Sequence, residues 1–175
     1  LKSFAHIYEL EDAKRLVRSG LDVLAHSVRD QEIDQAFIAL LKKHDVTAVA
    51  TLTREKSTYI YADSPPWIDD EFFTEGTTPE VIQELKSIVK ERQNRDPKQD
   101  LNRQNFEIAR RNLKILSDGG VRIGFGTDTG PPGRFPGFFE HWEMQLMVEA
   151  GLTPMQVITS FSRSAAEALG VDNDR

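Results

Sequence analysis

Short hydrophobic runs alternate with longer amphipathic stretches along most of the chain. Four of these runs predict β-strands, which end near His6, His26, Leu52 and Asp128. The stretches between them place hydrophobic residues three and four positions apart, the spacing of an α-helix with one buried face. Strands and helices that alternate in this order predict βα units built on a parallel sheet.

The expected helices carry clear start and stop signals. The first covers residues 11–19, is acidic at its start and basic near its end, and is followed by Gly20, as the helix dipole and the preference for a C-terminal glycine favour. A helix at 30–44 follows, and another starts at 79 with Ile88 on its apolar side. Two more are expected between a polar stretch at 94–102 and Gly119, and near 140–150. The last begins at Pro154, where residues 153 and 156 match a capping box.

The alternation is interrupted at residues 54–78, which predict a long loop rich in aromatic residues. A loop of this length inside a compact domain is usually functional or disordered, and the aromatic content argues against disorder. The loop then either forms a lid over a site or is held in place by its own hydrophobic cluster. The aromatic residues are Tyr59, Tyr61, Trp67, Phe72 and Phe73.

Composition narrows the class of protein. The 175 residues, 39% hydrophobic and 29% charged, suit one globular segment, so we treat 1–175 as a single unit. The net charge of −6 argues against nucleic-acid binding, which needs clustered Lys and Arg. No apolar run approaches the roughly 20 residues of a membrane span, so we expect no membrane partner. The chain has no cysteine, which excludes disulfides and thiolate metal ligands.

Candidate chemistry lies where three of the expected strands end. His6 and His26 are 20 residues apart, one βα period, which predicts neighbouring strand ends. Asp128 ends the fourth hydrophobic run, between Gly126 and Gly130. Imidazole nitrogens and a carboxylate suit Zn²⁺ and related metals. Singly, each histidine is more often a structural or solvent-facing residue, and Asp128 is equally well explained by a turn, but their joint placement favours a metal site.

Several of these segments resemble the metal-dependent amidohydrolase superfamily, particularly its imidazolonepropionase-like and prolidase-like branches. The first part of the chain resembles the unit that joins strands five and six of that family's barrel. Residues 126–130 resemble its strand-eight motif, and residues 149–154 and 165–170 resemble the helix that follows. In the first part the resemblance is carried by His6, Ala13, Gly20, Leu21, Asp22, Ala25 and His26.

The resemblance implies a fold and an activity. The fold is α/β, a partial (β/α)₈ TIM barrel of about four βα units that correspond to strands five to eight. The intact protein is then a hydrolase of amide, cyclic amide or peptide-like C–N bonds, with one or two divalent metals, zinc being the expected one. His6 and His26 would bind the more exposed metal. Asp128 would bind the other metal and act as the general base.

The sequence also departs from the family pattern. The family's strand-one His-x-His pair and strand-four lysine have no counterpart here, and Tyr8 stands where many relatives carry a second histidine. At most three metal ligands therefore remain in this chain. We expect the isolated 175-residue chain to be inactive.

Four further residues are candidates for binding a small amide or peptide-like substrate. Arg54 follows the third expected strand and could bind a carboxylate, although an ion pair with Glu55 explains it equally well. Arg134 lies in a proline- and glycine-rich loop that must pass over the site. His141, which lies two residues before Glu143 at the start of a helix, and Tyr59, in the aromatic loop, are weaker candidates. His141 and Glu143 could reach the mouth of the site, or they are ordinary polar residues of a helix start.

Two other classes of function compete with a metal-dependent hydrolase. A half-barrel leaves sheet edges unpaired, so the chain could instead be a non-catalytic fragment that self-associates into a homo-oligomer and binds no metal. A flavodoxin-like nucleotide-binding sheet is the weaker alternative. It would need a glycine-rich loop that leads directly into a helix, and the segment at 130–137 is too rich in proline.

Overall fold

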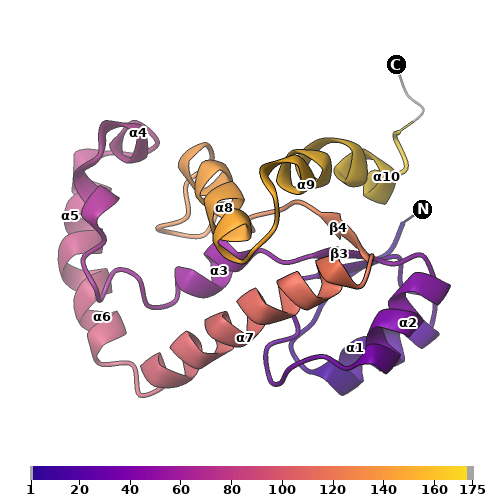
Figure 1. Cartoon of the computed structure of the whole chain (residues 1–175). Coiled ribbons are helices and arrows are strands. Elements are labelled where there is room, and N and C mark those ends of the chain that lie inside the picture. Colours follow the sequence, from indigo (N-terminus) through magenta and orange to yellow (C-terminus); the bar gives the residue numbers. More distant parts are fainter. Residues whose placement is uncertain (1, 173–175) are drawn as a thin grey trace.

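The computed structural model describes residues 2–172, which form a parallel sheet surrounded by helices (Figure 1). Within these residues the sheet has four strands: β1 (Phe4–His6), β2 (Val23–Ala25), β3 (Thr47–Val49) and β4 (Arg122–Gly124). Their order in the sheet is the order in the chain, and each neighbouring pair is parallel. This is the strand order of a (β/α)₈ barrel segment, so the predicted fold class is confirmed.

The register of the strands separates two faces of the sheet. Leu24, Ala48 and Ile123 are paired side by side, and all three belong to the buried hydrophobic core. Because side chains alternate along a strand, the adjacent positions point to the opposite face. His6 is one of these, at the C-terminal end of β1, beside Ala25 of β2. The sheet therefore sets a histidine at its C-terminal edge, away from the core.

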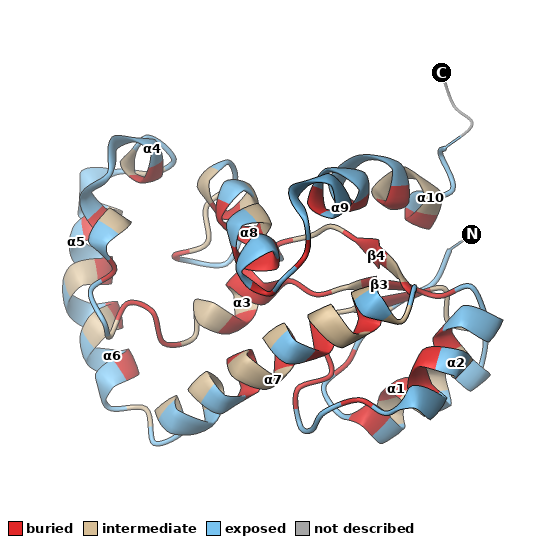
Figure 2. Ribbon diagram, viewed as in Figure 1, coloured by how far each residue is buried: buried red, intermediate tan, exposed pale blue. Residues whose placement is uncertain are grey.

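One long helix follows each strand and covers the core. These helices are α1 (Leu10–Arg18), α2 (Gln35–Lys43), α7 (Gln99–Asp118) and α8 (Phe138–Glu149). Their buried positions concentrate on the sides that face the sheet and one another (Figure 2). Phe37, Leu41, Leu113 and Leu146 are among the fully buried side chains. The 3.6-residue periodicity seen in the sequence reflects this burial.

Capping residues set where several helices begin. Asp34 accepts a hydrogen bond from the amide of Phe37 at 2.7 Å, so α2 starts at Gln35 and not at the expected residue 30. The predicted capping box is confirmed, because Thr153 and Gln156 exchange backbone-to-side-chain hydrogen bonds. It opens a continuous helical stretch made of α9 (Pro154–Thr159), the π-helical η3 (Ser160–Ser164) and α10 (Ala165–Leu169).

The segment expected to be a long loop is partly helical. It contains α3 (Leu52–Lys56), which starts where β3 was expected to end, the 3₁₀ turn η1 (Pro66–Asp69) and α4 (Glu71–Thr74). The ring of Trp67 packs against those of Phe73, Phe138 and Trp142, with centroids 4.7, 4.8 and 5.0 Å away. Apart from Tyr59, the aromatic residues thus form a packed cluster against α8, as the second interpretation of this segment expects.

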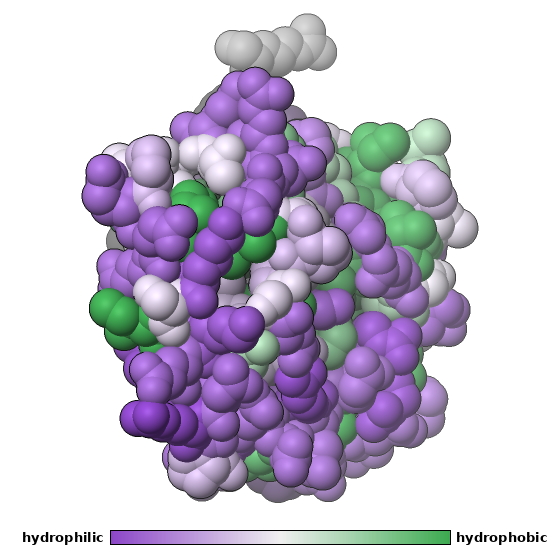
Figure 3. All heavy atoms as spheres, turned by 90° about the vertical axis from the view of Figure 1, so that its left-hand side faces the viewer, coloured by the Kyte–Doolittle hydropathy of each residue, from purple (hydrophilic) through white to green (hydrophobic). Residues whose placement is uncertain are grey.

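A second helical stretch continues from this segment and lies to the left in Figure 1. It comprises α5 (Pro79–Glu84), the π-helical η2 (Leu85–Val89) and α6 (Lys90–Asn94). The expectation for Ile88 is wrong, since its side chain is 64% exposed. The face of the molecule on this side is largely hydrophilic (Figure 3), in keeping with the five charged residues among residues 86–95. No helix within residues 2–172 is long and apolar enough to cross a membrane.

Candidate metal and substrate site

His6 and His26 face each other at the C-terminal ends of β1 and β2. Nδ1 of His6 lies 2.6 Å from Nε2 of His26, and the ring centroids are 4.6 Å apart. The two nitrogens share one hydrogen bond. The strand register brings the residues together, because His6 pairs with Ala25 and His26 follows directly. The 20-residue spacing in the sequence therefore corresponds to adjoining side chains.

His26 is held in one orientation and kept neutral. Its side chain is buried, and its Nδ1 shares a hydrogen bond of 2.7 Å with Oγ1 of Thr51, directly after β3. Burial lowers the pKa of His26 from 6.5 to about 4, and the positive charge of Arg54 acts in the same direction. At neutral pH the imidazole is uncharged, with a ring nitrogen aimed at His6.

The backbone after three consecutive strands is in the left-handed region. The φ angles are 75° at His26, 51° at Thr51 and 57° at Asp128. Residues other than glycine avoid this region, and such strain is often found at functional sites. These turns lie beyond the C-terminal ends of β2, β3 and β4, and the side chains of two of them, His26 and Thr51, share a hydrogen bond.

Asp128 does not join the two histidines. Its Oδ2 forms an ion pair with Nη1 of Arg134 at 2.7 Å. The negative charge of Asp128 still reaches His26, whose pKa it raises against the larger effect of burial. Across the described residues 2–172, no three His, Asp or Glu side chains are grouped so that they could hold a metal ion. The structure therefore brings together two of the three ligands expected from the sequence.

The two histidines nonetheless fit a metal ion. Two nitrogens bound to one tetrahedral zinc at bonds of about 2.0–2.1 Å would be roughly 3.3 Å apart, so the rings need only separate slightly. His26 is neutral, as a metal ligand must be, and its second nitrogen has a partner that fixes the ring. A hydrogen bond of that kind is typical of histidine ligands. To become a third metal ligand, the carboxylate of Asp128 would have to turn away from Arg134.

A buried charge network supports the first two strand ends. Arg29 donates hydrogen bonds of 2.9 Å to the carbonyls of Ile7 and Ser27, which follow β1 and β2. It also forms a buried ion pair of 3.0 Å with Glu55 of α3. Arg54 pairs with the other oxygen of Glu55 at 2.8 Å, the ordinary role weighed for it from the sequence. Arg54 also lines a hollow of about 480 Å³ together with both site histidines.

Two carboxylates of α8 bind the segments that follow β3 and β4. Glu143, which is 1% exposed, accepts hydrogen bonds from the amides of Leu52 and Thr53 at 2.8 and 2.7 Å. Burial raises the pKa of Glu143 to about 7, although the donors of Thr53 and Leu52 oppose that rise. Glu140 accepts from the hydroxyl of Thr127 at 2.7 Å, one residue before Asp128.

The sequence predicts Glu143 only as a polar residue near a helix start that, with His141, could reach the mouth of the site, and it does not predict that Glu143 is buried. A signal was present in its spacing. Phe139, Trp142 and Leu146 mark the buried face of α8, and Glu143 lies on that face beside Trp142. An acid at a core position of an amphipathic helix is rarely left without a partner.

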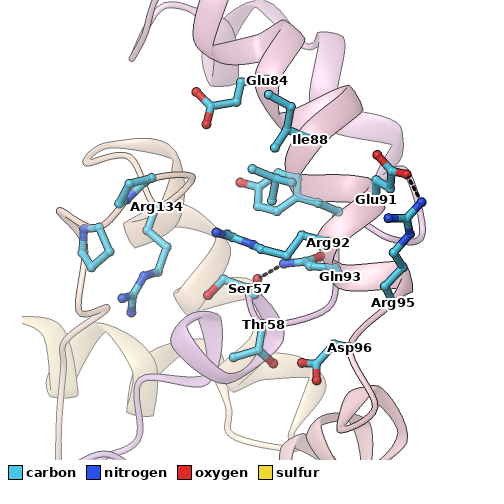
Figure 4. Close-up of a pocket in the computed structure, with 14 residues that line it drawn as sticks. Ser57, Thr58, Glu84, Ile88, Glu91, Arg92, Gln93, Arg95, Asp96 and Arg134 are labelled. Atoms are coloured by element: carbon cyan, nitrogen blue, oxygen red, sulfur yellow. Dashed lines mark hydrogen bonds and ion pairs between the residues drawn. The ribbon is translucent and has the colours of Figure 1, made fainter.

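A larger hollow of about 940 Å³ lies between the loop after β4 and the helical stretch α5–α6. Arg92 and Arg134 extend into it from opposite walls (Figure 4). The hydroxyl of Tyr61, in the segment after α3, donates to the carbonyl of Gly133 and so connects that segment to the loop after β4. Arg134 both lines this hollow and holds Asp128, so the hollow adjoins the fourth strand end.

The structure places Tyr59 and His141 elsewhere. Tyr59 is buried, with its ring edge-on to Phe106 and the guanidinium of Arg103 4.5 Å from the ring centroid. His141 lies on the exposed side of α8, edge-on to the ring of Phe72 at 5.1 Å. Neither is among the described residues that line the two hollows.

Comparison with known proteins finds the same fold in solved structures described as a dipeptidase, a putative prolidase and an amidohydrolase. No family model and no curated protein matches the sequence. Among solved structures, a Xaa-Pro dipeptidase with bound methionine in the active site matches 99% of this chain at a TM-score of 0.67 and 18% identity. A putative prolidase from Bifidobacterium longum matches 98% of the chain (TM-score 0.69, 20% identity). The bottromycin amidohydrolase also matches 98% (TM-score 0.66, 16% identity).

The matches are confined to part of each solved structure. The chain spans 35% of the dipeptidase, 37% of the putative prolidase and 41% of the bottromycin amidohydrolase. At these identities the matches establish a shared fold. The resemblance proposed from the sequence is thereby confirmed at the level of the fold, a partial barrel of the kind found in prolidases and amidohydrolases.

Proposed function

We propose that residues 1–175 are one segment of an amidohydrolase-type barrel, equivalent to its C-terminal half. The intact enzyme would hydrolyse amide, cyclic amide or peptide-like bonds with the help of a divalent metal, zinc being the expected ion. The observation that carries the proposal is the 2.6 Å approach of His6 Nδ1 to His26 Nε2 at adjoining strand ends. Support comes from the matched structures, which are described as a dipeptidase, a prolidase and an amidohydrolase.

Each residue of the site has a separate task in this proposal. His6 and His26 would hold the metal, and Thr51 would fix the ring of His26. A metal bound there supplies Lewis-acid polarisation of the substrate carbonyl and makes water more acidic. Asp128 is the proposed general base and a further ligand, because its carboxylate can accept a proton at the same edge of the sheet. Arg134 controls where that carboxylate points.

The substrate is proposed to be a small amide or peptide-like molecule that enters the hollow of about 940 Å³. Arg134 lines this hollow, and Arg54 lines the smaller one beside the histidines. Guanidinium groups form paired hydrogen bonds with carboxylates. These two arginines are therefore the proposed contacts for an anionic group of the substrate. Tyr59 and His141 have no place in the proposed site.

The metal content of the purified chain tests this proposal. We expect elemental analysis to find about one divalent metal ion per chain after exposure to zinc and dialysis, lost in His26→Ala. His44→Ala is the matched control, since His44 is the exposed C-terminal cap of α2 and its removal should leave the metal content unchanged. Equal metal in all three proteins, or none in the unmodified chain, would contradict the proposal.

Self-association without catalysis is a second candidate function, favoured by a different observation. Within the described residues, β1 and β4 each pair on one side only. Phe4, Met155 and Phe161 are 50, 69 and 53% exposed. Sedimentation velocity over a hundred-fold range of concentration tests this candidate, which predicts a dimer at high concentration. A monomer throughout would exclude it.

A further inference from the structure

Helix α3 begins without help from its own N-cap residue. Thr51 occupies the N-cap position but makes no side-chain hydrogen bond to the helix. A threonine in this position normally accepts a hydrogen bond from the second or third amide of the helix. Here the hydroxyl is instead 2.7 Å from Nδ1 of His26. The side chain that would cap α3 is thus used by the site.

Glu143, a residue of α8, caps α3 in place of Thr51. Its Oε1 accepts from the amide of Leu52 at 2.8 Å, and its Oε2 accepts from the amide and the hydroxyl of Thr53, both at 2.7 Å. These amides belong to the first two residues of α3, where orphan donors occur and a negative charge is favoured. Because Glu143 satisfies them, the hydroxyl of Thr51 stays available to His26.

Without the carboxylate of Glu143, the hydroxyl of Thr51 would be needed to cap α3. The amides of Leu52 and Thr53 are buried, and a buried donor without a partner is unfavourable. The acceptor that a helix N-cap ordinarily supplies to such donors is the hydroxyl of Thr51. If that hydroxyl turned toward the helix, Nδ1 of His26 would lose its partner, so the ring would lose the hydrogen bond that fixes its orientation and its tautomer would be free to change.

We propose that Glu143 is a positioning residue for His26. By capping α3 in place of Thr51, it keeps the Thr51 hydroxyl on Nδ1 of His26 and directs Nε2 of that ring toward His6. The inference rests on the proposed function where the ligand is a metal ion. The coupling between Glu143, Thr51 and His26 belongs to the metal-free protein and can be measured there.

The first experiment follows the tautomer of His26 by ¹⁵N NMR of the metal-free chain at pH 7.5. We expect a single tautomer in the unmodified protein and a mixture in Glu143→Gln and in Thr51→Val. The control is Asp34→Asn, which removes the carboxylate that caps α2 and should leave the His26 signals unchanged. An unchanged tautomer in a folded Glu143→Gln variant would overturn the proposal.

The second experiment titrates Co²⁺ alone and follows its visible absorption. We expect Glu143→Gln and Thr51→Val each to weaken binding about ten- to a hundred-fold, as is common when a partner of a ligand is removed. The double variant should bind no more weakly than Thr51→Val alone, because both changes remove the same hydrogen bond. Additive losses would mean that Glu143 acts only on overall stability, against the proposal.

The two experiments separate this inference from the proposed function. If the unmodified chain binds no Co²⁺ but Glu143→Gln still changes the tautomer of His26, the metal site fails and the positioning role stands. If Co²⁺ binds and the tautomer and affinity are both unaffected by Glu143→Gln, the positioning role fails alone. Circular dichroism of each variant confirms that it is folded before either measurement.

Discussion

Replacing Glu143 with glutamine should change how the free energy of unfolding depends on pH. Glu143 and His26 titrate over the same pH range, and they change the free energy of unfolding in opposite directions. The pKa of Glu143 is raised from 4.5 to about 7 in the folded chain, so the folded state holds the extra proton between these values. Stability from this group is present at low pH and is lost as the pH rises toward 7.

His26 behaves in the opposite way. Its pKa is lowered from 6.5 to about 4 by burial, so between these values it is the unfolded state that binds the extra proton. The stability linked to neutral His26 is fully present above pH 6.5 and is lost as the pH falls toward 4. Between about pH 5 and about pH 7.5, each group changes the free energy of unfolding by roughly 2 kcal/mol. The two contributions therefore nearly cancel in the unmodified chain.

Urea unfolding in the presence of a metal chelator, followed by the fluorescence of the two tryptophans, measures this balance. In Glu143→Gln the free energy of unfolding should rise by roughly 2 kcal/mol from about pH 5 to about pH 7.5. In His26→Asn it should fall by a similar amount, and in the double variant it should change little. Glu149→Gln, an exposed acid on the same helix, should match the unmodified profile. A constant difference between Glu143→Gln and the unmodified chain would refute the reasoning.

Three further substitutions test the core, the backbone and the ion pair at the site. Leu24→Ala removes a side chain that is 1% exposed and should lower the free energy of unfolding by about 2–5 kcal/mol. Leu101→Ala, at a 45% exposed position, is the control and should change that free energy by much less. Urea unfolding measures both variants. Ser64→Gly relieves a φ of 52° and should stabilise the chain by up to about 1 kcal/mol in the same assay, and a loss of stability would contradict this. Arg134→Gln frees the carboxylate of Asp128 and should tighten Co²⁺ binding several-fold in an absorption titration, an effect that should vanish in a variant that also carries Asp128→Asn.

The order of the strands and helices could be predicted because burial requires hydrophobic residues at regular positions in the sequence. Parallel strands covered by helices need continuous apolar residues, and Val23–Ala25, the run that leads to His26, is of this kind. The spacing of these histidines then fixes their proximity, since one βα unit separates neighbouring strands. For this reason, contacts between residues at the ends of neighbouring strands can be predicted from the sequence.

Contacts that depend on loops or on distant helices could not be predicted in the same way. Asp128 pairs with Arg134 because the loop after β4 folds back, with φ angles of 117° at Gly130 and 81° at Gly133. No periodic pattern of hydrophobic residues in the sequence indicates that this loop folds back. The start of α2 was also misplaced, because the capping carboxylate of Asp34 decides it against an apolar pattern that begins earlier.

Glu143 shows why the supporting residues of a site are harder to find than the residues they support. Thr51 alone would be interpreted as an ordinary N-cap and His26 as a lone histidine after a strand. The hydrogen bond between them is possible only because a carboxylate 90 positions further along the chain binds the amide of Thr53. The site histidines lie on neighbouring strands and can be predicted from one repeating unit. The residue that frees their partner lies on α8, after the fourth strand, so its role emerges only when the second, third and fourth units of the sheet are assembled together.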